Sequence, residues 1–293
     1  MPELDCDVWV LDNASEDGSA DAVREAYGDR VNLVPLRRRA GKAENDTRLL
    51  ELSEGRYCLL LNEDSELRPG AAGALHEALE SDSRAAIAGA QLLAPDGTRQ
   101  PCAWRFPSPG TALAGAVFLH HRYTVQSEGS VTRAVDWVQS SAMMVRRSAY
   151  REVGGLDPQF FVYSDEVDWC KRFHDANWRV LYVPAAEAIH HEQLSSDSDF
   201  SERRVVEFNR NRDRYMRKHH SPAAAATVRA LTAWSYGARA AAALITPGRD
   251  PRRFARHAQA ALNPSRGEGL AEEAARFNAG LPEAGEEEDS QSR

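Results

Sequence analysis

The chain has 293 residues, 42% of them hydrophobic, which is enough for one large domain with appendages. Its net charge of −8 argues against a nucleic-acid partner, and its four scattered cysteines argue against a zinc–thiolate site and favour a reducing cytoplasm. The start, Met1 to Asp7, is too polar for a signal peptide, and no apolar run reaches the roughly 18 residues that cross a bilayer.

Strands and helices alternate along the first part of the chain. We predict strands over 8–11, 31–36, 57–61 and 85–93, and helices over 20–27, 46–54 and 69–81. This alternation is typical of an α/β domain with a mostly parallel sheet. Ligands bind beyond the carboxyl ends of such strands, where the polar groups Asp12-Asn13 and Asn62-Glu63-Asp64 stand.

The pattern weakens over residues 95–130, where prolines and glycines predict a long loop that borders a site. Further on we predict a strand over 135–146, a short helix over 148–153, a helix over 165–176, a strand over 179–183 and helices over 200–220 and 223–245. We therefore expect a domain at 1–220 and a helical extension at 221–279. The acidic segment 280–293 is expected to be disordered.

An acidic cluster follows an aromatic run in the middle of the chain. Asp165, Glu166 and Asp168 come directly after Phe160 to Tyr163. Carboxylates in close contact raise the pKa of one member, which suits a general base. The alternative is an acidic first turn of a helix, where negative charge is favourable against the helix dipole. These residues by themselves leave both interpretations open.

An ordered set of segments resembles the family 2 glycosyltransferases of the GT-A fold, close to the rhamnosyltransferase-like members. The segments are Val10 to Ser19, Leu59 to Asp64, Val145 to Arg147, Val153 to Asp157, Phe160-Phe161, the acidic cluster, Trp178 to Pro184 and His190-His191. The resemblance implies a Rossmann-like mixed sheet flanked by helices. It also implies inverting transfer of a sugar, such as rhamnose from its dTDP form, to a cell-surface glycan or a lipid-linked acceptor.

The resemblance also implies the donor site. Asp12, Asn13 and Asn62 are expected to contact the sugar nucleotide, although Asp12 could equally cap a helix. Asp64 is expected to bind a divalent cation, Mg²⁺ or Mn²⁺, with His190 completing the site. The alternatives are a plain turn at the end of a strand and a structural histidine.

Further residues are assigned by the same resemblance. Glu166 is expected to be the catalytic base, with Asp165 as the alternative, because the order of the two acid types is reversed here. Arg203, together with Ser195, is expected to lie near the diphosphate. Trp137 and Asp168 are expected on the acceptor side, although Trp137 could be a core residue and Asp168 could pair with Arg172.

The family normally opens with one more strand and helix than this chain shows. We expect the first βα unit to be missing, and a truncated chain or misassigned start is favoured over a non-catalytic copy or a partner that supplies the strand. The alternative function is a non-catalytic sugar-nucleotide-binding or scaffold protein. A glycoside hydrolase is disfavoured because sequence-adjacent acids point apart.

The alanine-rich helix at 223–245 carries Trp234, Tyr236, Arg229 and Arg239. It could lie on a membrane surface, which would suit a lipid-linked acceptor, or pack on the domain. We expect a cytoplasmic protein that is peripheral on the inner face of the plasma membrane. The sequence does not predict the oligomeric state.

Overall fold

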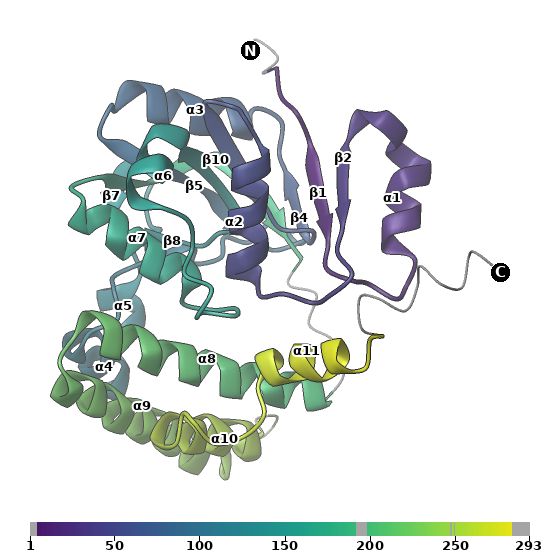
Figure 1. The fold of residues 1–293 in the computed structure, drawn as a ribbon. Coiled ribbons are helices and arrows are strands. Elements are labelled where there is room, and N and C mark those ends of the chain that lie inside the picture. Colours follow the sequence, from purple (N-terminus) through teal and green to yellow (C-terminus); the bar gives the residue numbers. More distant parts are fainter. Residues whose placement is uncertain (1–4, 192–197, 247, 249, 283–293) are drawn as a thin grey trace.

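The computed structural model describes residues 5–191, 198–246, 248 and 250–282. Strands and their covering helices form one part of the molecule, and a layer of long helices lies beneath them (Figure 1). Most of the predicted elements are confirmed within a few residues of their expected bounds.

The central sheet has six strands and is mixed. Its order is β3 (Tyr57–Leu61), β9 (Ala142–Arg146), β5 (Ala85–Leu93), β10 (Arg179–His190) and β4 (Ser65–Leu67), with β7 (Arg133–Val135) also paired to β10. Strands β5 and β10 run parallel, whereas β9, β4 and β7 are antiparallel to their neighbours. The mostly parallel sheet expected from the alternation is therefore wrong, and the mixed sheet implied by the resemblance is confirmed.

The middle of this sheet forms the main core. All nine residues of β5 are buried, and α3 (Ala71–Ser81) and α7 (Asp165–Asp175) pack on the sheet. A Cβ at Gly89 would come within 2.6 Å of the Val138 side chain. Glycine is therefore needed there for the short strand β8 (Trp137–Val138) to pack closely on β5.

A second, smaller pair of strands lies beside the six-stranded sheet. Strands β1 (Trp9–Asp12) and β2 (Asn32–Pro35) pair in parallel, and α1 (Ser19–Tyr27) with the short helix η1 (Gly28–Arg30) connects them. Among the described residues, neither strand pairs with the larger sheet. Helix α2 (Lys42–Leu52) lies between the two groups of strands and contacts β1 (Figure 1).

The long loop predicted over 95–130 is wrong. The segment contains β6 (Ala103–Trp104), α4 (Pro109–Ala116) and α5 (His120–Thr124). Pro109 occupies the first turn of α4, where its fixed φ suits a helix, and Ser108 accepts a hydrogen bond from Thr111 N at 3.2 Å. The prolines that indicated a loop instead mark a helix start.

The strand predicted over 135–146 is divided. Residues 139–141 separate β8, which pairs with β6, from β9, which pairs with β3 and β5. Helix α6 (Arg147–Val153) then follows β9 directly. One apolar run can therefore contribute strands to two different sheets when a polar break such as Ser140-Ser141 lies inside it.

Four helices follow the sheet in sequence: α8 (Ser198–His219), α9 (Pro222–Ala243), α10 (Pro251–Leu262) and α11 (Leu270–Ala279). Helix α9 packs against α8, α10 and α4, and the Tyr236 ring stacks on His257 at 4.5 Å. The α9 surface expected to meet a membrane is therefore partly covered by protein. Among the described residues, no helix combines the length and apolarity needed to cross a bilayer. The expected disordered tail lies outside the described residues from 283 onward.

Candidate active site

The end of β10 brings two predicted metal ligands together. His190 pairs in register with Ser65, the first residue of β4, so it lies beside Asp64. The His190 Nε2 atom is 3.5 Å from Asp64 Oδ1, and His191 N donates to the Asp64 carbonyl at 2.9 Å. The structure thus places Asp64 and His190 next to each other, as the sequence predicted.

This pair fits a divalent cation by its chemistry. Asp64 Oδ1 is buried and accepts no hydrogen bond, so it is an acceptor available to a metal ion. Carboxylate and imidazole both bind Mn²⁺. Among the described residues, no group of three or more His, Cys, Asp or Glu side chains that could hold a metal ion occurs.

Ser141 lies at the centre of the hydrogen bonds around this pair. Its Oγ atom is 3.3 Å from Asn62 Nδ2, 3.1 Å from Gln139 Nε2 and 3.3 Å from His190 Nε2. Asn62, expected to contact the donor, is thus tied to Ser141 through its amide nitrogen. The sequence analysis missed this role of Ser141, because it depends on the pairing of β3 with β9.

The predicted base lies at a strained turn. Tyr163 and Ser164 have φ values of 68° and 64°, a left-handed conformation that costs non-glycine residues about 1–2 kcal/mol each. Helix α7 starts directly afterwards, and it buries Asp165 to 1% exposure. Each acid keeps one buried oxygen, Asp165 Oδ2 and Glu166 Oε2, without a hydrogen bond.

The two acids interact strongly. Burial raises the pKa of both carboxyls, and the adjacent Asp165 adds to the rise that holds the pKa of Glu166 well above its usual range. The pair therefore titrates as a unit that keeps a proton at a higher pH than isolated carboxylates do. The raised pKa expected for clustered carboxylates is confirmed in direction.

Lys42 is the cation that the sequence analysis missed. Burial by itself would lower the pKa of its ammonium, but the carboxylates of Asp46, Asp165 and Glu166 outweigh burial and raise it. Lys42 N also donates to the Phe161 carbonyl at 2.6 Å. A Cβ at Gly41 would lie 2.7 Å from that carbonyl oxygen. Glycine at 41 therefore lets α2 approach the loop that precedes the acid pair.

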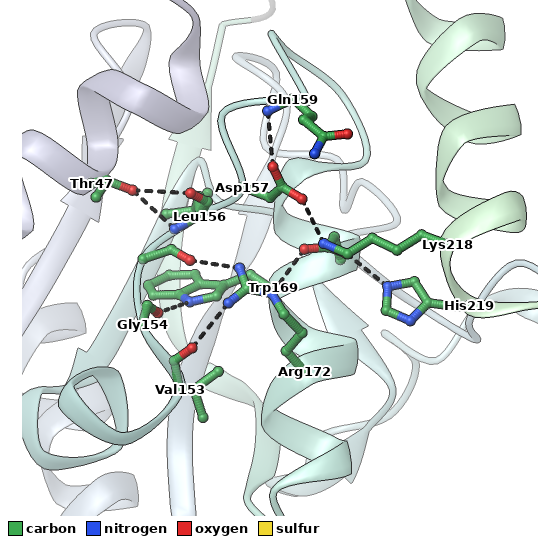
Figure 2. Close-up of polar contacts among 12 residues, drawn as sticks. Thr47, Val153, Gly154, Leu156, Asp157, Gln159, Trp169, Arg172, Lys218 and His219 are labelled. Atoms are coloured by element: carbon green, nitrogen blue, oxygen red, sulfur yellow. Dashed lines mark hydrogen bonds and ion pairs between the residues drawn. The ribbon is translucent and has the colours of Figure 1, made fainter.

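Asp168 has a different environment from the other two acids, because it contacts Arg172, Lys218 and His219, which are labelled in Figure 2. It is fully buried, and its oxygens lie 2.9 Å from Arg172 Nε, 2.8 Å from Lys218 Nζ and 2.7 Å from His219 Nε2. Burial by itself would raise the pKa of Asp168, but hydrogen bonds from His219, Lys218 and Arg172 lower it. The predicted Arg172 pair is confirmed. The carboxylate thus joins α7 to α8 through these partners, and the expected acceptor contact stays a prediction.

Helix α8 also supports the loop in front of the acid pair. Arg204 Nε donates to the Tyr163 hydroxyl at 2.5 Å, and Asn211 Nδ2 donates to the Val162 carbonyl at 2.8 Å. Lys218 Nζ lies 2.7 Å from Asp157. These three α8 residues are spaced by seven positions, so they lie on one side of the helix. They hold the strained turn in place.

On the donor side, two asparagines bind one loop from opposite ends of the sequence. Asn13 Oδ1 accepts from Ala40 N at 2.8 Å and Asn13 Nδ2 donates to Ala40 O at 3.0 Å. Asn278 on α11 does the same with Arg39, at 2.8 Å for both bonds. We call these four residues the amide clamp. Because its amide is used on the backbone, Asn13 positions the loop instead of presenting a free amide to a nucleotide.

The remaining predicted residues have protein partners. Asp12 Oδ2 accepts from Ser15 N at 3.1 Å, which closes a turn and does not cap a helix, because α1 begins at Ser19 with Gly18 as its N-cap. Arg203 pairs with Glu273 of α11 at 3.1 Å. Trp137 stacks on Trp104 with ring centroids 4.5 Å apart, which leaves at most its other face for a sugar. Ser195 lies outside the described residues.

Comparison with known sequences gives a family and named relatives. Residues 2–154 match the family model described as Glycosyl transferase family 2. An N-acetylglucosaminyl-diphospho-decaprenol L-rhamnosyltransferase of Mycobacterium tuberculosis is 32% identical over 213 residues, 66% of this chain and 68% of that protein. Rhamnosyltransferase WbbL of Escherichia coli K12 is 42% identical over 67 residues, 23% of this chain and 25% of that protein.

Comparison with solved structures gives the fold. The crystal structure of GalNAc-T7 with UDP, GalNAc and Mn²⁺ superposes with a TM-score of 0.55 at 11% identity. The match covers 94% of this chain and 52% of that one, so this chain spans about half the length of the solved protein. At such low identity the similarity shows the fold and gives no information about the substrate.

Proposed function

The chain belongs to glycosyl transferase family 2 and has the GT-A fold, and from this premise we propose that it transfers a sugar from a nucleotide-diphosphate donor to a lipid-linked acceptor. The family, fold and enzyme class predicted from the sequence are thereby confirmed. The observation that carries the proposed chemistry is the buried acid pair, Asp165 and Glu166, with Lys42 as its cation.

The substrates of the proposal come from the relatives. The mycobacterial relative is named for an N-acetylglucosaminyl-diphospho-decaprenol acceptor and a rhamnosyl donor, and the Escherichia coli relative is also a rhamnosyltransferase. We therefore propose a deoxyhexose nucleotide such as dTDP-rhamnose as the donor. A growing cell-surface glycan on its polyprenyl diphosphate carrier is the proposed acceptor.

In the proposed mechanism, the acid pair supplies the base. Its ionised carboxylate takes the proton of the acceptor hydroxyl as the oxygen attacks the anomeric carbon. The bond from that carbon to the diphosphate breaks on the opposite face, so the configuration inverts. Lys42 favours the ionised state of the pair, and the α8 contacts hold Tyr163 and Ser164 so that both acids keep their positions.

The metal-binding residues of the proposal are Asp64 and His190. A divalent cation bound there supplies positive charge that offsets the charge of the leaving diphosphate. Ser141 orients His190 and Asn62, and the amide clamp shapes the loop before α2. Residues from β1, β4, β10 and α7 then share one reaction, with the donor held between the two groups of strands.

Calorimetric titration with UDP and dTDP, with and without Mn²⁺, tests the donor site. We expect metal-dependent binding that Asp64→Ala abolishes and Glu166→Gln leaves intact. Transfer from dTDP-rhamnose to a polyprenyl-diphosphate acceptor should then be lost in Glu166→Gln. A well-folded chain that binds neither nucleotide would contradict the proposal and favour a non-catalytic scaffold.

A further inference from the structure

The turn that joins α4 to α5 exposes an unusual number of large apolar side chains. They are Leu113, Val117, Phe118, Leu119 and Tyr123, each between 51% and 57% exposed. We call these residues the α4–α5 corner. It lies at one end of the helical layer, beside α9 (Figure 1). Contiguous exposed apolar patches on soluble proteins usually mark an interaction surface.

Phe118 stands at a backbone position that favours glycine. Helix α4 ends in a Schellman motif, in which Leu119 N donates to Ala114 O at 2.7 Å and Phe118 N donates to Gly115 O at 3.2 Å. Phe118 itself has a φ of 61°, which is strained for a bulky residue. The chain therefore holds an aromatic ring towards solvent where glycine would fit without strain. Stability of the fold does not explain this choice.

The corner also differs in charge from the rest of the chain. The net charge of the chain is −8, yet no aspartate or glutamate occurs over 97–127 or over 214–248. These two stretches contain α4, α5 and the whole of α9, and α4 packs against both other helices. These three helices therefore carry no acidic residue, and Glu128, just beyond the first stretch, lies 3.9 Å from His121 of α5.

Arginines border the apolar side chains. The Arg239 guanidinium lies 5.0 Å from the Phe118 ring centroid, and that of Arg105 lies 5.4 Å from the Tyr123 ring. Arg122 is exposed on α5. Apolar and aromatic groups surrounded by arginine suit an anionic bilayer, because the rings enter the interface while the cations meet lipid phosphates.

The inner side of the same helix packs on the core beside α7. Ala112 on α4 and Trp137 pack against the cluster that contains Phe160 and Val167. Val167 follows the acid pair on α7. The corner is therefore joined through α4 to the part of the core next to the acid pair.

We propose that the α4–α5 corner docks this protein on an anionic membrane surface. The sequence expectation placed the contact on α9. Of the residues named there, Tyr236 and Arg229 are engaged with His257 and Asp213, Arg239 borders the corner, and Trp234 is 65% exposed. Docking at the corner deepens the proposed function by naming where the lipid carrier lies. Docking itself needs neither donor nor catalysis, so vesicle binding tests it independently of sugar transfer.

The test is co-sedimentation of the full chain with phosphatidylcholine vesicles and with vesicles that also contain phosphatidylglycerol. We expect binding to the anionic vesicles only, weakened by salt. Phe118→Gly should reduce the partition coefficient by at least about tenfold, because an aromatic anchor is lost. Its thermal unfolding midpoint should be equal or higher, because glycine relieves the left-handed strain. Tyr27→Ser, a change at a 51% exposed aromatic on α1, is the matched control and should bind like the parent chain.

Three results would overturn the docking proposal. The first is no binding of the parent chain to anionic vesicles, and the second is equal binding of the parent and Phe118→Gly. The third is a dimer in sedimentation velocity that Phe118→Gly dissociates, which would assign the corner to a second copy of the chain. Retained vesicle binding without any sugar transfer would instead count against the proposed function and leave docking intact.

Discussion

The two groups of strands in this molecule are held in place by different kinds of contact. The six-stranded sheet is joined by backbone pairing along its strands and buries β5 completely. The β1–β2 pair meets the rest of the chain largely through side chains, as in the amide clamp and the Arg39 guanidinium 3.8 Å from the Phe277 ring centroid. Asp64 and His190 belong to the first group, and Asp12 and Asn13 to the second.

Because of this difference, we expect substitutions in the two groups of strands to affect two different properties, the chemical step and donor binding. Changes around the large sheet and α7 should affect the chemical step or the stability of the whole domain. Changes at the clamp should affect donor binding, because only a few side-chain hydrogen bonds fix that loop. The predictions below test this separation.

The largest effect is expected at the acid pair. Glu166→Gln keeps the shape of the side chain but removes the base, so kcat should fall by about 10²–10⁴-fold with donor affinity unchanged. Steady-state transfer assays and nucleotide titration measure the two quantities. Asp165→Asn is the companion variant, and the variant with the larger loss identifies the base. Similar small losses in both would show that the pair does not carry proton transfer.

Asp168→Asn should cause the largest loss of stability. It removes a fully buried carboxylate that Arg172, Lys218 and His219 share, and breaking a buried ion pair costs up to about 3–5 kcal/mol. Because the folded-state pKa of Asp168 is lowered, its contribution is present above the ordinary pKa of about 4 and disappears as pH falls through the folded value. Urea unfolding at several pH values measures this difference, and a constant difference across pH would refute the assignment.

At the clamp, Asn278→Ala should raise the donor KM with little change in kcat. Two hydrogen bonds to Arg39 are lost, each contributing about 1 kcal/mol, so the increase should be roughly tenfold or more. Gln259→Ala, on α10 of the same helical layer, provides a control away from the loop. A fall in kcat with unchanged KM would contradict the prediction that the clamp affects donor binding and not the chemical step.

The smallest effect concerns pH. Because burial raises the pKa of both acids, kcat should fall with decreasing pH at a higher pH than an ordinary carboxylate would give. Lys42 favours the ionised form, so Lys42→Met should move this acid limb to higher pH. A pH–rate profile measures the shift. An acid limb at the same pH as in the parent chain would show that Lys42 does not act on the pair.

Local sequence patterns predicted those parts of the fold and site that depend on neighbouring residues. The apolar run 85–93 matches β5, and the predicted strand 57–61 leads to Asp64. The strand predicted over 179–183 continues further than expected, as β10, to His190. Most of the functional assignment came from the family resemblance, which rests on many short segments that match the family in order although each match is weak by itself. The acid pair was found because both members are adjacent in the chain.

Features that depend on distant partners could not be predicted in this way. Lys42, Ser141 and Asn278 acquire their roles only when α2, β9 and α11 meet other elements. Arg203 was expected to meet a diphosphate, but its partners Glu268 and Glu273 lie far along the chain. Pro109 indicated a break in structure, although in the fold it begins a helix.

The amide clamp also has a consequence for biosynthesis. Arg39 and Asn278 are 239 residues apart in sequence, so their hydrogen bonds cannot form until synthesis has passed α11. The six-stranded sheet needs only residues up to His190 and can assemble earlier. A nascent chain would therefore bring Asp64 and His190 together before the loop in front of α2 is secured, and under the proposed function sugar-nucleotide affinity would follow only after α11 has been synthesised.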